Sequence, residues 1–499
     1  MEQAMNDDDL PVASLAVPGC PGCERLLKRI EKMEIRLAAM EALEARVMEL
    51  EELVKQLTAR LNQNSTNSSK PPSSDPPGTP PPQTKEKSGR KPGGQPGHEG
   101  HRRERLPKER ITRIVHHAPK ECEACGKKLP QKPGPSDPPG HEPSWHQVTE
   151  VPPFAAEVTE HQGHACACEN CGHITRAEIP PEIRAHAIGP NLASILSFLS
   201  GRCHESKRTV QEVAESLFGV QISLGTISNL EREMQKALAS SYEEAKVAVT
   251  EAPSKNVDET GWYQKSGLQW LWGAATQKVA YFQVHAKRGR AGLNAFLGDV
   301  VKGIVTSDRW GAYSRLLLEG RQICWSHLKR DFQKLIDSGN DTSIKLGRTG
   351  LKVVKELFKI WHDFKAEKFG RRSLRNRIAP VQERLKRALI CGRDGPDPAT
   401  ARFSKRILKI FSALWTFIEH EDVEPTNNHA ERLLRPAVLW RKRSFGNHSE
   451  AGCRFTERML TTVQTLRFQR RHVLSYLRDA VVAHRCHSSP PPLLTAIED

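Results

Sequence analysis

Three acidic residues lie in sequence settings that could support metal-dependent chemistry. Asp258 and Asp308 each close a run of strand-forming residues, whereas Glu431 lies in an arginine-rich segment with helical spacing. Carboxylates in such positions can hold two divalent cations while phosphate oxygens supply the remaining ligands. The pattern predicts a site that cuts and joins DNA, with Asp258 bridging both metals and Asp308 and Glu431 each completing one. Any one of these acids taken alone is more simply a solvated surface carboxylate.

The segment that follows Glu431 could hold the phosphates beside such a site. On a helix, Arg435 shares the face of Glu431, and Arg432 lies beside it. Pro436 is expected to end or kink this helix. The residues predicted to contact DNA here are Arg432, Arg435, Arg441 and Lys442.

Two C-x-x-C pairs offer a second kind of metal site. Cys122 and Cys125 form the first pair, and Cys168 and Cys171 form the second. Each pair can supply half of a tetrahedral zinc site, so we expect one structural Zn²⁺. Cys166 and the histidines His161, His164 and His173 crowd the second pair, and one of them could replace a predicted ligand. A redox-active pair is the rival interpretation, but nothing nearby resembles a thioredoxin-like unit.

Composition is compatible with a polyanionic partner. The 499 residues include 75 Lys and Arg against 59 Asp and Glu, which gives a formal net charge of +16. The chain has no run of about 18 apolar residues and no apolar segment at its start, which predicts neither a membrane span nor a signal peptide. We expect a cytosolic protein, nucleoid-associated if it binds DNA. Twelve cysteines in a chain of this length indicate metal ligands and buried thiols more than disulfides.

The N-terminal region has a heptad pattern over residues 24–61. Met40, Val47, Val54 and Leu61 fit a positions, and Leu43, Leu50 and Leu57 fit d positions. Branched a residues with leucine at d favour a parallel dimer, so a homodimeric coiled coil is predicted, with Arg46 facing Glu51 of the partner. The alternative is a helix that packs on its own chain.

Three segments separate this helix from the acidic residues. Residues 62–110 are rich in Pro, Gly, Ser and basic residues, which predicts a disordered linker that either contacts phosphates or serves as a solvated spacer. Residues 111–180 form the expected zinc module. Residues 185–250 are helical in pattern and could include a helix-turn-helix with Thr226, Ser228 and Asn229 in a major groove. A plain helical hairpin is at least as compatible, because the second helix carries little positive charge.

The remaining chain, 251–475, reads as an α/β domain. Strands are expected after residue 254, at 270–276, 279–284, 304–306 and 321–325, followed by a helix from 326. Three antiparallel strands and then crossover helices are the layout of a ribonuclease H-like core, with the first acid on the first strand and the second after the fourth. Glu259, next to Asp258, should point to the opposite face. A helical insertion is expected at about 340–420, and a loose tail at 476–499.

Taken together, these pieces resemble transposases of the insertion-sequence sixty-six family. The resemblance rests on the zipper, Asn-Ser-x-Asn-Ser-Ser-Lys-Pro-Pro-Ser at 64–73, the paired knuckles, Asp258-Glu259-Thr260, Asp308 with Tyr313, Cys324-x-x-His327-x-x-Arg330-x-Phe332 and Asn428-x-x-Glu431-Arg432. One departure is Arg443-Ser444-Phe445-Gly446, where many relatives carry another apolar-aromatic run. The carboxylates are unaffected by it.

The resemblance implies a prokaryotic DDE transposase that uses Mg²⁺, recognises terminal inverted repeats and target DNA as duplexes, and works with separately encoded helper proteins. Two other classes remain open. One is a DNA-binding regulator or inactive relic without catalysis, and the other is a structure-specific nuclease or resolvase on the same core.

Overall fold

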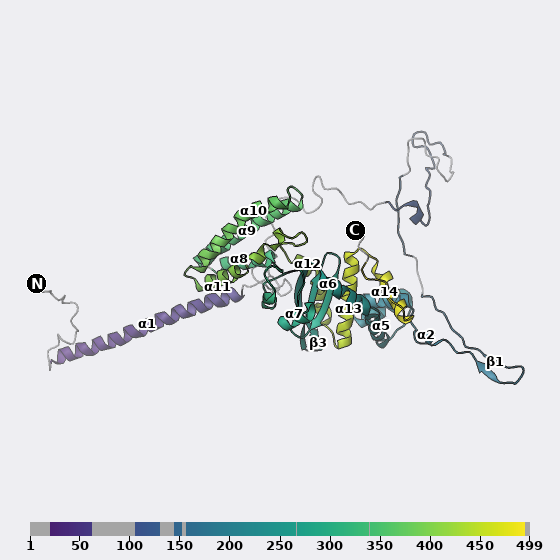
Figure 1. Cartoon of the computed structure of the whole chain (residues 1–499), viewed down its shortest axis with the longest axis horizontal. Coiled ribbons are helices and arrows are strands. Elements are labelled where there is room, and N and C mark those ends of the chain that lie inside the picture. Colours follow the sequence, from purple (N-terminus) through teal and green to yellow (C-terminus); the bar gives the residue numbers. More distant parts are fainter. Residues whose placement is uncertain are drawn as a thin grey trace. The chain divides into compact units, whose positions relative to one another are not determined.

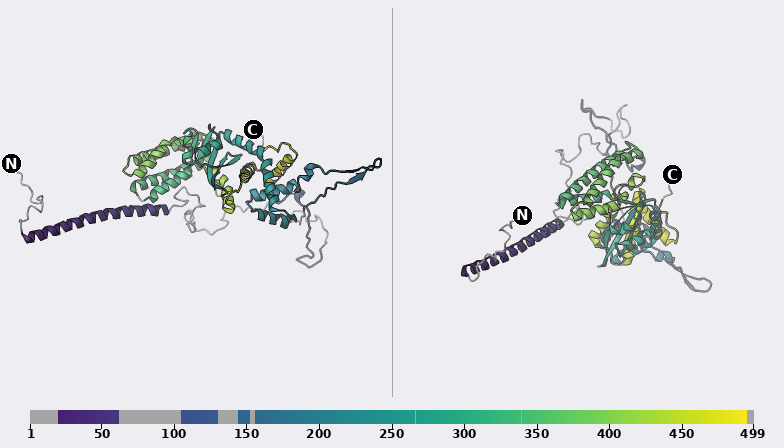
Figure 2. Two further views of the ribbon diagram at one scale, coloured as in Figure 1. Left: turned by 90° about the horizontal axis from the view of Figure 1, so that it is seen from below. Right: turned by 60° about the vertical axis from the view of Figure 1, so that its left-hand side comes forward.

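In a computed structural model of the chain, the residues described are 20–61, 105–129, 144–151, 156–265, 267–338 and 340–494 (Figures 1 and 2). Two compact units are present, one formed by Met1–Thr79, Pro180–Val210 and Leu224–Asp499 and the other by Pro80–Ile179 and Gln211–Ser223. Helices combine with a mixed sheet, as expected for an α/β protein. Within the described ranges, no helix is long and apolar enough to cross a membrane.

A five-stranded mixed sheet lies at the centre of the first unit. Its order is β5-β4-β3-β6-β7. The strands are β3 (Ser254–Gln264), β4 (Gly267–Ala275), β5 (Ala280–His285), β6 (Ile304–Ser307) and β7 (Arg321–Ile323). β3, β4 and β5 pair antiparallel, whereas β6 runs parallel to β3 and β7 parallel to β6. The last five residues of β4 are all buried, which is typical of a strand covered on both faces.

Helices from distant parts of the sequence cover this sheet. α12 (Asn428–Ser444) packs on β3 and β4, while α6 (Ala239–Glu251) and α13 (Glu450–Phe468) pack on β5. The shared core includes Trp262, Trp272 and Phe282 from the strands and Ala437 and Met459 from the helices. The short helix α7 (Arg290–Leu297) lies between β5 and β6 in the chain and packs on β5.

α12 continues through Pro436, so the helix does not stop there, and a kink at this residue stays a prediction. Proline in a helix removes one backbone hydrogen bond and clashes with the preceding turn. Leu433, Leu434 and Ala437 on either side of Pro436 are buried against the sheet, and this packing holds the helix together across the proline. The helix ends instead at Phe445, which has a left-handed backbone with φ of 59°.

The outer edge of β5 is covered by polar side chains of α13. The backbone N–H groups of Ala280 and Phe282 donate to the hydroxyls of Thr465 and Thr461 at 3.0 and 3.1 Å. The N–H of Val284 donates to Glu457 Oε1 at 2.6 Å. The three acceptors are spaced four residues apart on one helix face, and together they satisfy alternate N–H groups along the edge strand.

A helical insertion separates β7 from α12 and has its own core. It consists of α8 (Trp325–Asp337), α9 (Asp341–Lys365), α10 (Arg371–Arg393) and α11 (Pro398–Lys409), drawn in green in Figure 1. Phe332, Leu357, Leu385 and Ile407 are fully buried in this core. Two 3₁₀ turns, Ser412–Leu414 and Thr416–Ile418, follow α11 and lead back toward α12. The segment expected as an insertion at about 340–420 is helical from α9 to the second 3₁₀ turn, and α8 precedes it.

The helices before the sheet are α2 (Pro181–Arg184), α3 (Pro190–Gly201), α4 (Lys207–Phe218) and α5 (Leu224–Ala237). α14 (Val473–Arg485) packs on α3 and α5. The tail predicted to begin at residue 476 therefore starts later. Tyr476, Leu477 and Ala480 are buried, and this apolar stripe makes the segment a packed helix.

α1 (Pro21–Leu61) is a single helix of 41 residues, as the heptad pattern predicts. Its a and d side chains from Met40 to Leu57 are exposed, each by between 46% and 64%. A continuous apolar seam left open to solvent is typical of a helix that pairs with another helix. Arg46 forms an ion pair within the helix, with Glu49.

The second unit contains the short strands β1 (Ala165–Ala167) and β2 (Ile174–Arg176), which pair antiparallel. Lys108–Arg110 forms a 3₁₀ turn at the end of the predicted linker. Most of that linker, residues 62–104, lies outside the described part of the chain, as do residues 130–143 of the predicted zinc module.

Candidate functional site

Asp258 and Asp308 lie on adjacent parallel strands. Asp258 is in β3, and Asp308 directly follows β6. Asn256 pairs with Thr306, and in the same register Asp258 comes opposite Asp308. Neighbouring strands are about 4.8 Å apart, so the two carboxylates arise from backbone positions close enough to share a cation. Their Oδ1 atoms each accept a local backbone N–H, from Glu259 at 2.9 Å and from Trp310 at 2.8 Å.

Glu431 comes from the first turn of α12, and Asn427 fixes the start of that helix. Asn427 is fully buried, and its Nδ2 donates to the carbonyl of Val257 at 2.8 Å. Its Oδ1 accepts from Asn256 Nδ2 at 3.0 Å, and its backbone N–H donates to Cys324 Sγ at 3.1 Å. These bonds tie the beginning of α12 to β3 next to Asp258. The sequence analysis did not identify Asn427, although it is adjacent to the conspicuous Asn428–Glu431 pattern.

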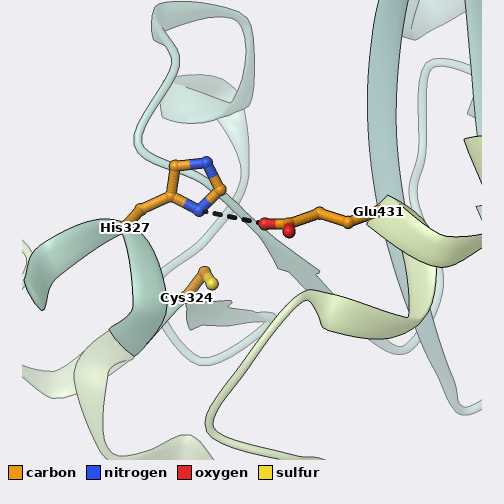
Figure 3. A group of neighbouring side chains, drawn as sticks. All are labelled: Cys324, His327 and Glu431. Atoms are coloured by element: carbon orange, nitrogen blue, oxygen red, sulfur yellow. Dashed lines mark ion pairs between the residues drawn. The ribbon is translucent and has the colours of Figure 1, made fainter. Parts of the chain in front are cut away.

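Cys324 and His327 approach Glu431 from the start of α8 (Figure 3). The ligand atoms of these three residues all lie within 4.8 Å of one another. His327 Nδ1 is 3.7 Å from Glu431 Oε1, and both atoms are buried without a hydrogen-bond partner among the described residues. Arg330 NH2 lies 3.7 Å from the same oxygen. Nitrogen, sulfur and oxygen donors in one place suit a softer divalent cation such as Zn²⁺, which would compete with Mg²⁺ for Glu431.

The charges of the three predicted acids act on one another, but among the described residues their oxygens do not form a group close enough to hold one metal ion; Glu431 lies with Cys324 and His327 instead. Burial raises the pKa of Asp258 well above its usual range, and the negative charges of Glu259, Asp308 and Glu431 raise it further. Burial also raises the pKa of Glu431, with Arg330 opposing and Asp308 adding to the shift. Burial lowers the pKa of His327 to about 3, and the charges of Arg330 and Arg309 act in the same direction. Clustered carboxylates that disfavour one another's ionisation fit a divalent cation, because a cation relieves their repulsion.

This repulsion leads to a prediction for the metal-free protein. Folding raises the pKa of Asp258 above its value in the unfolded chain, which is near 4. The stability that protonated Asp258 contributes is therefore fully present below pH 4. It is lost as the pH rises through the pKa of Asp258 in the folded protein. At neutral pH, Asp258→Asn should therefore raise the thermal midpoint of the metal-free protein, by about 2–4 °C for each kcal/mol gained. The gain should disappear at pH 4. Glu319→Gln, which changes an exposed carboxyl on the surface, is the control and should shift neither midpoint.

Glu259 has a structural environment, in agreement with the expected strand alternation. Its side chain is 1% exposed and pairs with Arg288, whose Nε lies 2.9 Å from Oε1. The hydroxyl of Tyr313 donates to Oε2 at 2.7 Å. Arg288 itself stacks between Trp270 and Trp310, with its guanidinium carbon 4.7 and 4.2 Å from the two ring centroids. Both oxygens of Glu259 are therefore engaged by protein groups.

Arginines surround Asp308, and sequence patterns did not reveal them. Burial raises the pKa of Asp308, while the charges of Arg288, Arg309 and Arg321 act to lower it. Arg309 is held by an ion pair with Asp331 of α8. Arg321, in β7, is 3% exposed, and no local pattern in the sequence distinguishes it from a solvated residue.

The basic residues predicted to contact DNA divide into two groups. Arg432, Arg435 and Lys442 are exposed on α12, near Glu431 or at the end of the helix. Arg441 is partly buried and donates to Thr260 Oγ1 at 3.3 Å and to the carbonyl of Gly261. Its guanidinium therefore ties the last turn of α12 to β3, which makes its first role structural.

The predicted base-reading residues lie on α5. Asn229 is exposed and accepts a hydrogen bond from Arg232 at 3.0 Å. Ser228 is bonded to Lys207 Nζ at 2.7 Å, and Lys207 also pairs with Glu231 at 2.9 Å. Thr226 is partly buried. These contacts engage part of the surface that a recognition helix would present to DNA.

The two C-x-x-C pairs form knuckles with the same backbone geometry. Gly126 N–H donates to the carbonyl of Cys122, and Gly172 N–H to that of Cys168, each at 2.8 Å. Both glycines have φ of 73°. Backbone N–H groups, first that of Cys125 and then that of Ala124, lower the pKa of Cys122, and the second knuckle repeats this at Cys168. Within the described ranges, the four sulfurs do not come together as one cluster.

The predicted zinc module has a direct test. Each knuckle stabilises a thiolate, which is the form that binds Zn²⁺. Metal analysis of the purified protein should find about one zinc per chain, lost on Cys122→Ser or Cys168→Ser together with local order. Cys166→Ser is the control and should retain the metal. Loss of zinc in that variant would instead place Cys166 and a neighbour in the ligand set.

Comparison with known proteins assigns the chain to a family. A family described as Transposase IS66 family matches residues 202–454, a span that contains the whole sheet and all three acids. A second family, described as Family of unknown function (DUF6444), matches residues 23–104 and so covers most of α1. None of the curated proteins matches the chain. Since the first match covers just over half of the 499 residues, the chain belongs to the Transposase IS66 family.

Proposed function

We propose that this chain is a DDE-type transposase that cleaves DNA at the ends of a mobile element and joins those ends to target DNA. The sheet from β3 to β7 with α12 would be a ribonuclease H-like core. Asp258, Asp308 and Glu431 would be the catalytic acids. Family membership supports a role in DNA transposition. The three acids support metal-dependent cleavage as its chemistry.

The observation that carries this proposal is the placement of the three acids. Asp258 and Asp308 come from adjacent parallel strands in matched register, and Glu431 comes from a helix pinned to the same strand by Asn427. Each acid alone could be incidental. Three carboxylates whose charges act on one another are a suitable ligand set for a pair of divalent cations.

In the proposed reaction, water or a DNA 3′-hydroxyl attacks a phosphodiester in line. Bound divalent cations would stabilise the entering and leaving oxygens. Asp258 would hold both cations, and Asp308 and Glu431 one each. Arg432 and Arg435, which are exposed beside Glu431, would bind the phosphates that flank the scissile bond. Arg330 and His327 would keep Glu431 oriented toward the sheet.

The partners follow from the same proposal. Duplex DNA with terminal repeats is the substrate, and target DNA accepts the cut ends. The exposed seam of α1 supports a homodimer that would bring two active sites together. Helper proteins encoded with the element remain a further expectation.

The direct test is incubation of the purified full-length protein with candidate element ends. Strand cleavage that needs Mg²⁺, followed by joining to a target duplex, would support the proposal. Cleavage without joining would favour a nuclease or resolvase. Specific binding with no cleavage under any divalent cation would favour a regulator or an inactive relic.

A further inference from the structure

One face of α9 carries a continuous row of basic side chains. Leu346, Val353, Leu357 and Trp361 are buried on the opposite face. The basic residues are spaced three and four apart, which places them along one side of a helix within an arc of about 80°. At 1.5 Å per residue the row extends for about 21 Å. We call it the α9 stripe, and it consists of the exposed residues Lys345, Arg348, Lys352, Lys355 and Lys359.

The α9 stripe has acids near both ends, and the charge of Lys359 acts on Asp363 together with that of Lys368. None of its residues has an ion pair within the described ranges. Glu356, the acid next to the stripe, is held by Arg384 of α10 at 2.6 Å. Asp363, beyond its C-terminal end, is held by Lys368 at 2.7 Å. Asp341 is the remaining acid on this side of the helix and lies in the first turn, where it favours the helix dipole.

The arginines that follow Glu431 in the sequence differ from the α9 stripe. Arg454 pairs with Glu457 at 2.8 Å, and Arg443 pairs with Glu205 at 3.0 Å. Arg458 bonds to Gln235, and Arg471 bonds to the carbonyl of Pro492 at 3.2 Å. Much of the basic charge that the sequence concentrates after Glu431 is therefore used to hold the protein together. The charge of the α9 stripe is not used in this way.

The chemistry of the α9 stripe indicates which partner fits it. No large apolar side chain is strongly exposed among the described residues of α8 to α11. Protein interfaces depend on aromatic and apolar anchors and are depleted in lysine, whereas four of these five residues are lysines. Binding of single strands would need exposed aromatic rings for base stacking, and this surface has none. Evenly spaced ammonium groups suit the evenly spaced phosphates of a duplex.

We propose that the α9 stripe binds the sugar-phosphate backbone of duplex DNA without reading its sequence. This inference rests on the proposed function and assigns part of the DNA contact to the helical insertion. α9 packs against α8, which supplies His327 and Arg330 to the acidic site. DNA held along α9 is thus held by the same group of packed helices that borders the site.

The salt dependence of binding tests this proposal. Each phosphate contact contributes about 0.9 to the slope of log affinity against log salt concentration. The test variant is the full-length protein carrying K345Q, R348Q, K352Q, K355Q and K359Q. On a random-sequence duplex without Mg²⁺, we expect the slope for this variant to be smaller in magnitude than the wild-type slope by about 4 to 5. Between 50 and 200 mM salt, the wild-type affinity should fall by a further factor on the order of 10²–10³ relative to the variant.

A control of equal charge separates a specific surface from general attraction. Lys246, Lys302, Arg375, Arg393 and Arg478 are exposed or partly exposed bases that each form an ion pair with an acid. Changing all five to Gln removes the same net charge and should leave the slope within about 1 of wild type. Circular dichroism should show both variants folded, because all of the changed side chains reach solvent.

Two outcomes would overturn the proposal. One is a wild-type slope in the α9 stripe variant, which would leave an acidic protein as the better partner for this surface. The other is an equal loss of slope in the control variant, which would show that only net charge matters. A protein that never cleaves element ends would refute the proposed function, but the binding slopes would still decide whether the α9 stripe contacts DNA.

Discussion

Asp258→Asn, Asp308→Asn and Glu431→Gln are each expected to reduce metal-dependent cleavage of element ends by about 10³-fold or more. Metal ions contribute several kcal/mol of charge stabilisation to such reactions, and each 1.4 kcal/mol corresponds to a factor of ten in rate. Binding of DNA should change little, because the exposed basic residues remain. Cleavage of labelled ends and binding at matched salt would be measured on the same preparations.

The control for this prediction is the neighbouring acid. Glu259→Gln weakens the buried contact with Arg288 and should lower the thermal midpoint. Folded Glu259→Gln protein should still cleave, because both Glu259 oxygens are engaged by Arg288 and Tyr313 and the proposal assigns Glu259 no metal. Near wild-type cleavage by any one of the three site variants would refute the role proposed for that acid. Complete loss of cleavage in well-folded Glu259→Gln protein would mean that the wrong carboxylate of the adjacent pair had been assigned.

Leu50→Lys combined with Leu57→Lys is expected to separate the α1 dimer into single chains. Both leucines occupy d positions of the exposed seam, and burying two charges there should cost several kcal/mol per dimer. Sedimentation would show monomers at concentrations where the wild-type protein is dimeric. Complexes that hold two DNA ends should be lost, while binding of one end by a single chain should persist.

Met48 provides a matched control on the same helix. It occupies a b position and is 71% exposed, so Met48→Lys changes charge outside the seam. This variant should remain dimeric and pair two ends. If the double d-position variant also remains dimeric and pairs ends, α1 has another use, of which docking a helper protein is the first to test.

The strands were predictable because their signals are local. Alternating apolar residues and a turn at Gln277-Lys278 placed β4 and β5 within a few residues of their observed limits. Asp308 directly follows β6 as expected, but Asp258 lies inside β3 and does not close it, because pairing with β4 extends the strand to Gln264. The heptad pattern similarly placed the helix that is observed as α1.

The remaining features depend on contacts between distant residues. Pro436 should disrupt a helix when judged alone, but burial of its neighbours on the sheet outweighs that preference. Arg441 resembles its exposed neighbours in the sequence, and only the fold shows that it reaches Thr260 and Gly261. Asn427 has no distinguishing local pattern, because its importance comes from bonds to β3 and to Cys324 at the start of α8, which are distant in the sequence.

The contact between α13 and β5 has a consequence for synthesis of the chain. The N–H groups of Ala280, Phe282 and Val284 find their acceptors only at residues 457, 461 and 465. A nascent or truncated chain that ends before α13 would thus present β5 with an open edge, which can pair with a strand of another molecule. Ribosomes release the chain from the N-terminus onward, so this edge stays unprotected while the whole helical insertion is being made. Fragments that stop short of residue 465 should consequently accumulate as aggregates.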